Sequence, residues 1–598
     1  MTTSTKNFIG VDTETYYEGS HKGLKSIQIY GWVDGKEVSL YLLPASFNAP
    51  DHMIRRELAA NFFSFFEKMK NDTEVAFFNI DFDISQVLYY MTNEAGYDIK
   101  HIGDPKRFNL SKGEMSILES ERNMYAVTFR TKNQGRMIRM IDLANFLPAS
   151  SLDSASESWL GEHKVKLEDK KFPKRMPTEE EKIYSMKDAE LTYKLFIELR
   201  RSGVIEGNKY VTIAGRTLGH FREFLKLRYN IGLDEYLFMT DDKAEIEAQK
   251  NLFETMLRSS TRGGMCMAVH TGVFEHCMHI DARSMYPTQC VRDFIPGGPI
   301  LTEPPEGPHT YILFPKGKFK LKQGKLPYFQ WRKKLQCIHY AYLTMYEPGE
   351  YVRDCMLDGT YGVWEEEWKI ILTNYEFEGP DEEEFEHLYI RMRENIALKQ
   401  YVQDLYTGKQ TNTGSKKLYF KYLLNSLYGK FLSRRNGVAI DYIDGKRVKV
   451  EENDRNTYYL PLGMWIAMMG RVTLFKAMSS IDSEDVLYCD TDSIIYKGDK
   501  HPDVHIGKEL GDWGIEAEDV KAYIVGPKTY QELTKDGKLT TKCAGMPKDI
   551  INQQTWLSIY EGLSVECRKP RRDQLTWAIN FEYTEFTIST RAQIFKSR

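Results

Sequence analysis

Two short apolar runs late in the chain enclose a polar hexapeptide. Val486–Leu487 precede the segment Tyr488–Ser493, and Ile494–Tyr496 follow it. Apolar runs on both sides of a polar turn predict a hairpin of two buried strands. The turn carries Asp490 and Asp492, and buried carboxylates are costly without a cation nearby. We therefore expect metal binding here, although Asp-Thr-Asp also occurs in ordinary polar turns.

The beginning of the chain predicts a strand that carries paired carboxylates. Phe8–Val11 is apolar, and Asp12 and Glu14 come directly after it. Alternate residues of a strand point to the same face, so both carboxylates could bind one metal ion. A second apolar run, Val75–Phe78, leads in a similar way to Asp83.

A helix after residue 178 is predicted to complete this acidic group. Thr178 and Glu181 have the spacing of a capping box, and Tyr184 and Asp188 follow on one helical face. The four carboxylates belong to Asp12, Glu14, Asp83 and Asp188. Such a set can hold two metal ions that activate water against a phosphodiester, and the Tyr184 hydroxyl could orient that water. Each motif alone is weak, because these residues are common in solvated turns.

Two further stretches suggest a site for a phosphorylated ligand. An apolar strand ends at Asp281, and the tight turn after it would expose backbone N–H groups, as a triphosphate site requires. Residues 415–427 form a clear helical pattern. One face of that helix carries Lys417, Lys421, Asn425 and Tyr428. Cations, an amide and an aromatic ring are poor core residues, so this face is expected to bind a ligand.

Composition limits the class of protein. The length of 598 residues suggests several domains, and 42% hydrophobic with 28% charged residues allows large cores. A net charge of −4 argues against a generally basic DNA-binding surface, so contacts with nucleic acid would need local basic tracks. The eight cysteines form no CxxC pair, the N-terminus lacks an apolar signal core, and no apolar segment is long enough to span a membrane. We expect a soluble cytoplasmic protein with no membrane partner.

Four segments carry coarser expectations. The region 316–334 interleaves lysine and arginine with aromatic residues, which is typical of nucleic-acid contact but also of the solvent face of an edge strand. The basic segment 164–175 could contact DNA or could be a solvated loop. Asp381–Glu384 is predicted to begin a helix that continues to about Asp404. Asp444-Gly445 predicts a hairpin turn.

Several motifs together resemble family B DNA polymerases. Tyr488–Ser493 resembles the carboxylate hairpin of the palm, Asp281–Pro287 the first polymerase motif, and Lys421–Gly429 the fingers motif. In the first 200 residues, Asp-x-Glu, Asn-x-x-Phe-Asp and Tyr-x-x-x-Asp resemble the proofreading 3′→5′ exonuclease of the same polymerases. Four positions depart from the family pattern, namely Leu143, Thr261, Met285 and Ala467.

The resemblance assigns expected roles to residues of both modules. In the polymerase, Asp281 and Asp492 would hold two Mg²⁺ ions, with Mn²⁺ as an alternative, and Asp490 would be an auxiliary carboxylate. The exonuclease would use Asp12, Glu14, Asp83 and Asp188 for its own two ions, with Tyr184. The expected nucleotide contacts are Tyr286 as the sugar gate, Lys409, Lys417, Lys421, Asn425 and Tyr428. The expected DNA contacts are Thr15, Asn79, Phe82, Arg262, Gly263, Gly264, Arg471, Lys528 and Tyr530.

Two insertions narrow the resemblance to the protein-primed subgroup, which is found in phages and plasmids with linear genomes. We expect an α/β multidomain protein in which an RNase H-like exonuclease domain precedes a right-hand polymerase. The expected segments are the exonuclease at 1–200, palm at 201–301, insertion one at 302–377, fingers at 378–431, insertion two at 432–458, palm again at 459–540 and thumb at 541–598. The implied partners of this monomer are primer-template DNA, dNTPs and a terminal protein that primes synthesis.

Two other hypotheses remain open on sequence alone. One is a nucleic-acid-primed repair polymerase of family B that has no terminal protein. The other is a catalytically inactive DNA-binding scaffold, which the intact carboxylates of both expected sites argue against.

Overall fold

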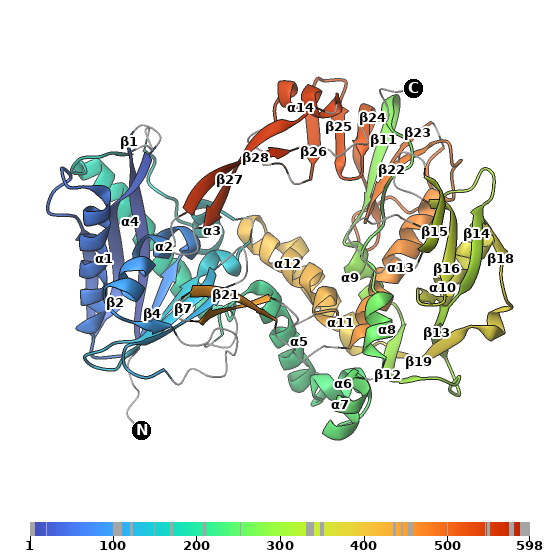
Figure 1. The fold of residues 1–598 in the computed structure, drawn as a ribbon. Coiled ribbons are helices and arrows are strands. Elements are labelled where there is room, and N and C mark those ends of the chain that lie inside the picture. Colours follow the sequence, from blue (N-terminus) through green and yellow to red (C-terminus); the bar gives the residue numbers. More distant parts are fainter. Residues whose placement is uncertain are drawn as a thin grey trace.

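The structure is a computed structural model of the 598-residue chain (Figure 1). It describes residues 6–18, 21–99, 110–119, 124–148, 150–167, 172–206, 211–251, 253–329, 340–346, 352–433, 438–443, 446–451, 459–498, 500–544, 546, 551–561, 563–572 and 579–586. We call residues 6–206 the N-terminal domain and residues 211–586 the C-terminal region.

A nine-stranded sheet forms the centre of the N-terminal domain. Its order is β3-β2-β1-β4-β8-β7-β6-β5, with β9 paired to β1. The strands are β1 (Asn7–Glu18), β2 (His21–Val33), β3 (Lys36–Leu42), β4 (Thr73–Phe77), β5 (Asp98–Ile99), β6 (Glu114–Glu119), β7 (Met124–Arg130), β8 (Met137–Asp142) and β9 (Phe172–Pro173). Because β1, β4 and β8 run parallel, the residues that follow Gly10 and Phe77 come to the same edge of the sheet.

Helices cover both faces of this sheet. They are α1 (Asp51–Glu67), α2 (Ile80–Asn93), α3 (Leu152–Leu160) and α4 (Glu179–Arg201), with a short 3₁₀ turn η1 (Leu143–Asn145). Ile9 and Val11 of β1 are buried in one core with α1 and α2. Gly10 points the other way, and a Cβ there would lie 2.4 Å from the backbone nitrogen of Tyr193 on α4. The alternation of β1 therefore directs successive residues to opposite helical layers.

A seven-stranded antiparallel sheet forms the centre of the C-terminal region. Its order is β10-β22-β23-β11-β24-β25-β26. The strands are β10 (Cys266–Ala268), β11 (Gly272–Ala282), β22 (Val486–Asp490), β23 (Ser493–Lys497), β24 (Trp513–Gly526), β25 (Thr529–Leu533) and β26 (Leu539–Cys543). The pairing of β22 with β23 confirms the hairpin predicted around Tyr488–Ser493.

Outside the first predicted insertion, the described part of the C-terminal region contains nine helices. They are α5 (Ile213–Tyr229), α6 (Leu233–Phe238), α7 (Lys243–Asn251), α8 (Glu254–Ser259), α9 (Met285–Cys290), α11 (Ala397–Thr411), α12 (Gly414–Phe431), α13 (Leu460–Met478) and α14 (Gln553–Tyr560). Helix α13 is apolar on all sides and is buried along nearly its whole length. Helices α11 and α12 pair with each other, and Figure 1 shows α12 extending across the molecule towards the N-terminal domain.

Two four-stranded sheets and a helix occupy the region of the first predicted insertion. The sheets have the orders β12-β19-β13-β17 and β15-β16-β14-β18. The elements are β12 (Phe294–Leu301), β13 (His309–Phe314), β14 (Lys316–Leu321), β15 (Tyr340–Tyr346), β16 (Val352–Asp358), β17 (Val363–Trp364), α10 (Glu365–Asn374), β18 (Tyr375–Glu378), the 3₁₀ turn η2 (Glu382–Glu384) and β19 (Glu386–Glu394). Strands β12 and β19, which lie outside the predicted limits 302–377, share a sheet with β13 and β17.

Two hairpins stand apart from the sheets. The first pairs β20 (Val438–Ile443) with β21 (Lys446–Glu451), in agreement with the turn predicted at Asp444-Gly445, which itself lies outside the described residues. The second pairs β27 (Val565–Arg572) with β28 (Ile579–Phe586). Figure 1 shows this second hairpin reaching towards the N-terminal domain.

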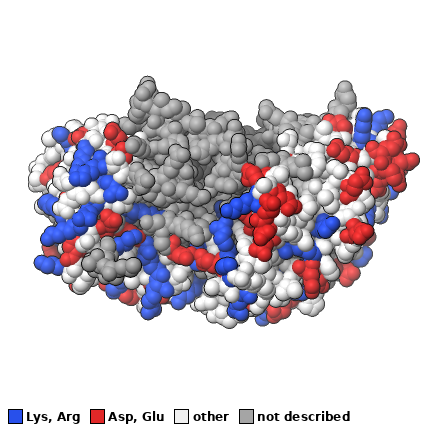
Figure 2. Space-filling view, turned by 90° about the horizontal axis from the view of Figure 1, so that it is seen from below, with Lys and Arg blue, Asp and Glu red and all other residues white. Residues whose placement is uncertain are grey.

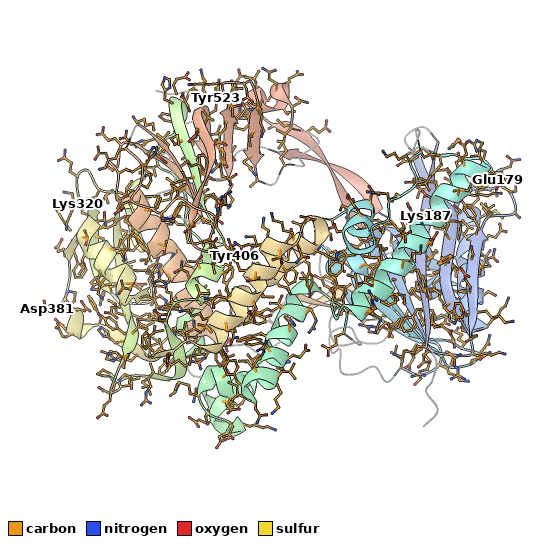
Figure 3. All side chains as sticks on the ribbon, turned by 180° about the vertical axis from the view of Figure 1, so that it is seen from behind. Glu179, Lys187, Lys320, Asp381, Tyr406 and Tyr523 are labelled. Atoms are coloured by element: carbon orange, nitrogen blue, oxygen red, sulfur yellow. The ribbon has the colours of Figure 1, made fainter. Side chains whose placement is uncertain are left out.

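The basic and aromatic residues of insertion one have a structural explanation. The lysines of β14 lie on its solvent face, and Lys320 is at the outer side of the module (Figure 3). Strand β14 is an inner strand, so the expectation of an edge strand is wrong. Phe319, Tyr328 and Phe329 are buried in the core, and they are therefore not placed to stack on bases.

The helix predicted from Asp381 to about Asp404 is wrong. The acidic run forms only the 3₁₀ turn η2, strand β19 follows, and α11 begins at Ala397. Figure 3 shows Asp381 at the outer edge of the module. None of the helices among the described residues has the length and apolar character needed to cross a bilayer. Figure 2 shows basic and acidic side chains mixed over one face, as the net charge of −4 leads one to expect.

Candidate active sites

Three carboxylates meet between β1 and α4 in the N-terminal domain. Oxygen atoms of Asp12, Glu14 and Asp188 all lie within 4.8 Å of one another. Asp12 and Glu14 point to the same side of β1 as Gly10, where the close approach of α4 brings Asp188 beside them. The structure therefore places the carboxylates of Asp12 and Glu14 on the strand beside that of Asp188 on the helix, as predicted.

Asp83 reaches the same edge of the sheet from the opposite layer. It belongs to the first turn of α2, and its Oδ1 accepts a hydrogen bond of 2.5 Å from Thr13 Oγ1. Burial raises the pKa of Asp83 to about 8, and burial together with Asp188 raises that of Glu14 to about 7. Burial and three neighbouring carboxylates also raise the pKa of Asp12 well above its usual range. Without a cation, burial and mutual repulsion favour the protonated form of these carboxyl groups. A divalent cation such as Mg²⁺ prefers hard oxygen ligands and would offset their negative charge, so the set fits such an ion.

A lysine that the motifs did not indicate completes this site. Lys164 Nζ lies 2.5 Å from Asp188 Oδ2 and 5.3 Å from the centre of the Tyr184 ring. Burial alone would lower the pKa of Lys164, but the charge of Asp188 raises it above the usual value. Lys164 lies in a loop and not in a helix or strand. The only sequence signal for it was its place in the basic segment 164–175.

A pocket of about 900 Å³ shares Lys164 and Tyr184 with this site. Its walls come from the start of α3 and from the segment 163–167, and they include Tyr184. The lining side chains combine the cations Lys164 and Lys166 and the imidazole of His163 with Asp153 and the apolar Leu152. Cationic and apolar walls together suit a ligand with a phosphate and a flat ring.

The residues expected to hold a single strand have different surroundings. Thr15 is buried, whereas Asn79 is exposed and adopts a left-handed conformation at the start of α2. The N–H of Asn79 donates to Asp142 Oδ1 at 2.8 Å, so Asp142 fixes this turn although sequence reasoning did not select it. The side chain of Phe82 lies outside the described residues.

The second acidic centre is built by strand register. Asp281 at the end of β11 pairs with Ser493 of β23, which places it beside Asp492 in the hairpin turn. The N–H of Ala282 donates to the Asp492 carbonyl at 2.7 Å. Burial and Glu516 raise the pKa of Asp281 to about 6, and burial with Asp281 raises that of Asp492 to about 7. This pair also fits a divalent cation.

Asp490, next to that pair, forms an ion pair with Lys528. Lys528 Nζ donates to both of its carboxylate oxygens, at 2.7 and 2.8 Å, and the Lys528 N–H donates to Tyr488 Oη at 3.0 Å. Tyr530 is buried, with its ring centre 4.9 Å from that of Tyr488. The two expected primer contacts therefore lie beside the auxiliary carboxylate.

The predicted ligand face of α12 is exposed above this centre. Lys417, Lys421 and Asn425 are exposed, whereas the opposite face of the helix is buried. Tyr428 stacks on Tyr286 with ring centres 4.0 Å apart and an interplanar angle of 30°. Lys409 of α11 also turns inward. Its Nζ donates to Ser284 Oγ in the turn after Asp281, at 2.9 Å.

Comparisons with known proteins agree with this arrangement. Residues 153–503 match the family "DNA polymerase type B, organellar and viral". The chain belongs to this family. It is 30% identical over 349 residues to the DNA polymerase of Bacillus phage Nf, an alignment that covers 52% of this chain and 58% of that protein. For the DNA polymerase of Bacillus phage phi29 the values are 27% over 343 residues, 52% and 57%.

The chain thus matches a little over half the length of these relatives. Over nearly the whole chain it shares the fold of phi29 DNA polymerase solved with primer-template DNA and incoming nucleotide. The TM-score is 0.72 at 18% identity, with 98% of this chain and all of that one covered. An orthorhombic crystal form of the same polymerase gives 0.73. The predicted two-module α/β fold is confirmed.

Arg471 was expected to contact DNA, and the structure places it in the protein interior instead. It is 6% exposed, and its Nε and Nη2 donate to Glu367 Oε1 at 3.0 and 2.8 Å. Its Nη1 donates to the carbonyls of Arg262 and Gly263, at 2.9 and 3.0 Å. A guanidinium at this depth needs a buried carboxylate as its partner, and Glu367 provides one.

The Arg262 side chain also points into the protein and binds Glu367. Its Nη2 donates to Glu367 Oε2 at 3.2 Å and to the Gly362 carbonyl at 2.6 Å. Burial would raise the pKa of Glu367, but Arg262 and Arg471 hold it at about 2. Glu367 comes from α10 of insertion one, more than a hundred residues from either arginine in sequence, so no local pattern could reveal the cluster.

The paired glycines next to Arg262 face the polymerase centre. A Cβ at Gly264 would lie 2.6 Å from Thr491 Oγ1 and 2.8 Å from Tyr286 Oη. A Cβ at Gly263 would meet no atom within 4 Å. Gly264 is therefore required by close packing against the carboxylate hairpin, while Gly263 lies against open space.

Proposed function

We propose that the chain is a DNA-directed DNA polymerase with a 3′→5′ proofreading exonuclease. The observation that carries this proposal is the presence of two separate acidic centres, one in each sheet. Asp281 and Asp492 meet beside the exposed cations of α12. Asp12, Glu14 and Asp188 meet between β1 and α4.

In the polymerase centre, a divalent cation held by Asp281 and Asp492 would lower the pKa of the attacking hydroxyl and offset the charge of the triphosphate. Lys417 and Lys421, one turn apart on α12, bind the triphosphate from the other side. Tyr286, stacked on Tyr428, closes the space beside the sugar and excludes a 2′-hydroxyl.

In the exonuclease centre, the four carboxylates Asp12, Glu14, Asp83 and Asp188 provide the corresponding cation site. Lys164 pairs with Asp188, and with Tyr184 it forms the side of the site that faces the pocket. That pocket, of about 900 Å³, is large enough to hold the terminal nucleotide of a strand during hydrolysis.

Synthesis is proposed to start on a protein. The relatives are phage DNA polymerases, and two extra modules flank the α11–α12 pair as in the protein-primed subgroup. Insertion one would dock a terminal protein whose hydroxyl side chain replaces the primer 3′-hydroxyl. Insertion two would close around DNA during strand displacement. We place this monomeric enzyme in the cytoplasm of a host cell.

The proposal is tested with a labelled primer-template in Mg²⁺, with and without the four dNTPs. We expect extension when nucleotides are present and shortening from the 3′ end when they are absent. A folded protein that binds this DNA but changes its length in neither condition would be an inactive scaffold, and the proposal would be wrong.

A further inference from the structure

The N-terminal domain contacts the tip of the α11–α12 pair through helix α3. Ser415, in the first turn of α12, is 1% exposed. Its N–H donates to Ser158 Oγ at 2.8 Å. Its Oγ accepts hydrogen bonds from Ser150 Oγ at 3.1 Å and from Trp159 Nε1 at 3.3 Å. Three residues around α3 thus converge on one serine of the polymerase region.

Helix α12 does not cap its own beginning. Thr413 stands at the N-cap position, and its side chain makes no capping hydrogen bond. The first N–H groups of a helix have no partner within the helix and need an acceptor from elsewhere. Ser158 supplies that acceptor to Ser415, so the cap of α12 comes from the N-terminal domain.

The contact leaves no room for a side chain at Gly414. Gly414 has φ of +53°, and a Cβ there would lie 2.2 Å from Ser158 Oγ. The Trp159 ring meets Tyr419 edge-on, with centres 5.9 Å apart, and Lys416 Nζ lies 5.2 Å from the centre of the indole. Polar, aromatic and cation–π contacts therefore all hold the same turn of α12.

The anchored turn is next to the proposed triphosphate contacts. Ser415 and Tyr419 are on the buried face of α12, and Lys417 is on the exposed face within the same first turn and a half. An uncapped helix frays at its end, and fraying would release Lys417 first and Lys421 after it. The position of the two lysines then depends on a contact made by the other domain.

We propose that α3 positions the fingers helix, with Ser158 as the cap of α12 and Trp159 as its packing partner, and that this contact sets the affinity for the incoming dNTP. The inference rests on the proposed polymerase function. Ser158 and Trp159 are positioning residues, because they act on the nucleotide only through the lysines of α12.

The test compares Ser158→Ala and Ser158→Thr with wild type in single-turnover insertion of one nucleotide on a primer-template. Loss of the cap is expected to raise the Kd for dNTP about threefold to tenfold, which corresponds to the free energy of one helix cap, with little change in the maximal rate. Ser158→Thr keeps the hydroxyl and should bind dNTP like wild type. Degradation of single-stranded DNA should not change in either variant.

A second pair of variants keeps the test decisive if one substitution disturbs folding. Gly414→Ala should weaken dNTP binding more than Ser158→Ala, and combining the two should recover part of the loss because the steric conflict is removed. Gly161→Ala is the control, since Gly161 also has positive φ but no atom near its Cβ position.

The proposal is overturned if Ser158→Ala and Gly414→Ala, with wild-type melting temperatures, bind dNTP like wild type. It is equally overturned if synthesis and degradation fall together in both variants. A wild-type protein that does not extend primers at all would instead contradict the proposed function. The two failures are therefore distinct.

Discussion

The two acidic centres are assembled in different ways. In the C-terminal sheet, antiparallel register places Asp281, at the end of β11, beside Asp492 in the turn between β22 and β23. In the N-terminal domain, Asp188 and Asp83 come from helices on opposite faces of β1. Their meeting therefore depends on how closely the helices pack, for which Gly10 leaves the space.

Each centre also pairs one carboxylate with a lysine. Lys528 holds Asp490, and Lys164 holds Asp188. In the polymerase centre this leaves the two remaining carboxylates next to each other. In the exonuclease centre three carboxylates remain, and burial with mutual repulsion raises their pKa values further. The exonuclease centre should therefore depend more strongly on a cation for its structure than the polymerase centre does.

The largest expected effects come from the carboxylates themselves. Asp281→Asn or Asp492→Asn should abolish nucleotide addition and leave degradation of single-stranded DNA intact. Asp12→Asn combined with Asp83→Asn should do the reverse. Primer extension and degradation measured on the same preparations check both statements. If either change removed both activities from folded protein, the centres would not be separate.

Shortening insertion two should produce the next largest effect. Replacing residues 432–458 with a short Gly-Ser link is expected to reduce product length and strand displacement on primed circular DNA, because an enclosing segment slows dissociation. Filling of short gaps should survive. If the wild-type and shortened enzymes displaced the same length of strand per binding event, the proposal that insertion two encloses DNA would be wrong.

Gly10→Ala should distinguish the two modes of assembly. A methyl group there would push α4 away from β1 and move Asp188, so degradation should fall about tenfold or more while synthesis changes little. Gly232→Ala is the matched control, because the nearest atom to its Cβ position is 3.9 Å away. Equal loss of both activities in Gly10→Ala would mean that the effect is general unfolding.

Tyr286→Val should change selectivity rather than overall rate. Removing the ring that stacks on Tyr428 opens the space beside the sugar, so ribonucleotide incorporation relative to deoxyribonucleotide should rise about tenfold or more. Single-turnover insertion of each nucleotide measures the ratio. An unchanged ratio would exclude Tyr286 as the sugar gate.

The smallest expected effect is on stability with a chelator present. Folded Glu14 and Asp83 have pKa values of about 7 and about 8, above those of unfolded chains. The stability that they contribute is therefore present at low pH and lost as pH rises through these values. The melting temperature in EDTA should fall between about pH 5 and pH 8, and Mg²⁺ should suppress the fall. Asp12→Asn with Asp83→Asn should flatten it more than Asp281→Asn does.

Sequence reasoning succeeded where a residue's role follows from its own element. The hairpin around Asp490 and Asp492, the paired carboxylates of β1 and the exposed face of α12 all reflect local periodicity. It failed where an alternating pattern was overlooked, as in β19 after the acidic run at Asp381. Phe319, Tyr328 and Phe329, which lie among the lysines of insertion one, are core residues that pack with the rest of the C-terminal region.

Residues that act across the chain were not predictable in this way. Glu367 binds two arginines from distant segments, and Lys164 meets Asp188 from a loop. The contact of Ser158 with Ser415 joins two domains. The partners of these side chains are distant in sequence and are set only by the tertiary fold.

The central claim is that two separate centres act on the same primer end, and idling turnover tests it most directly. With primer-template and only the next correct dNTP, the wild-type enzyme should convert dNTP continuously into dNMP. Asp281→Asn alone and Asp12→Asn with Asp83→Asn alone should each fail to do so. An equimolar mixture of these two variants should restore turnover, because one adds the nucleotide and the other removes it. Turnover by either variant alone would contradict the account. So would a mixture that shows no turnover although each variant in it keeps its own activity.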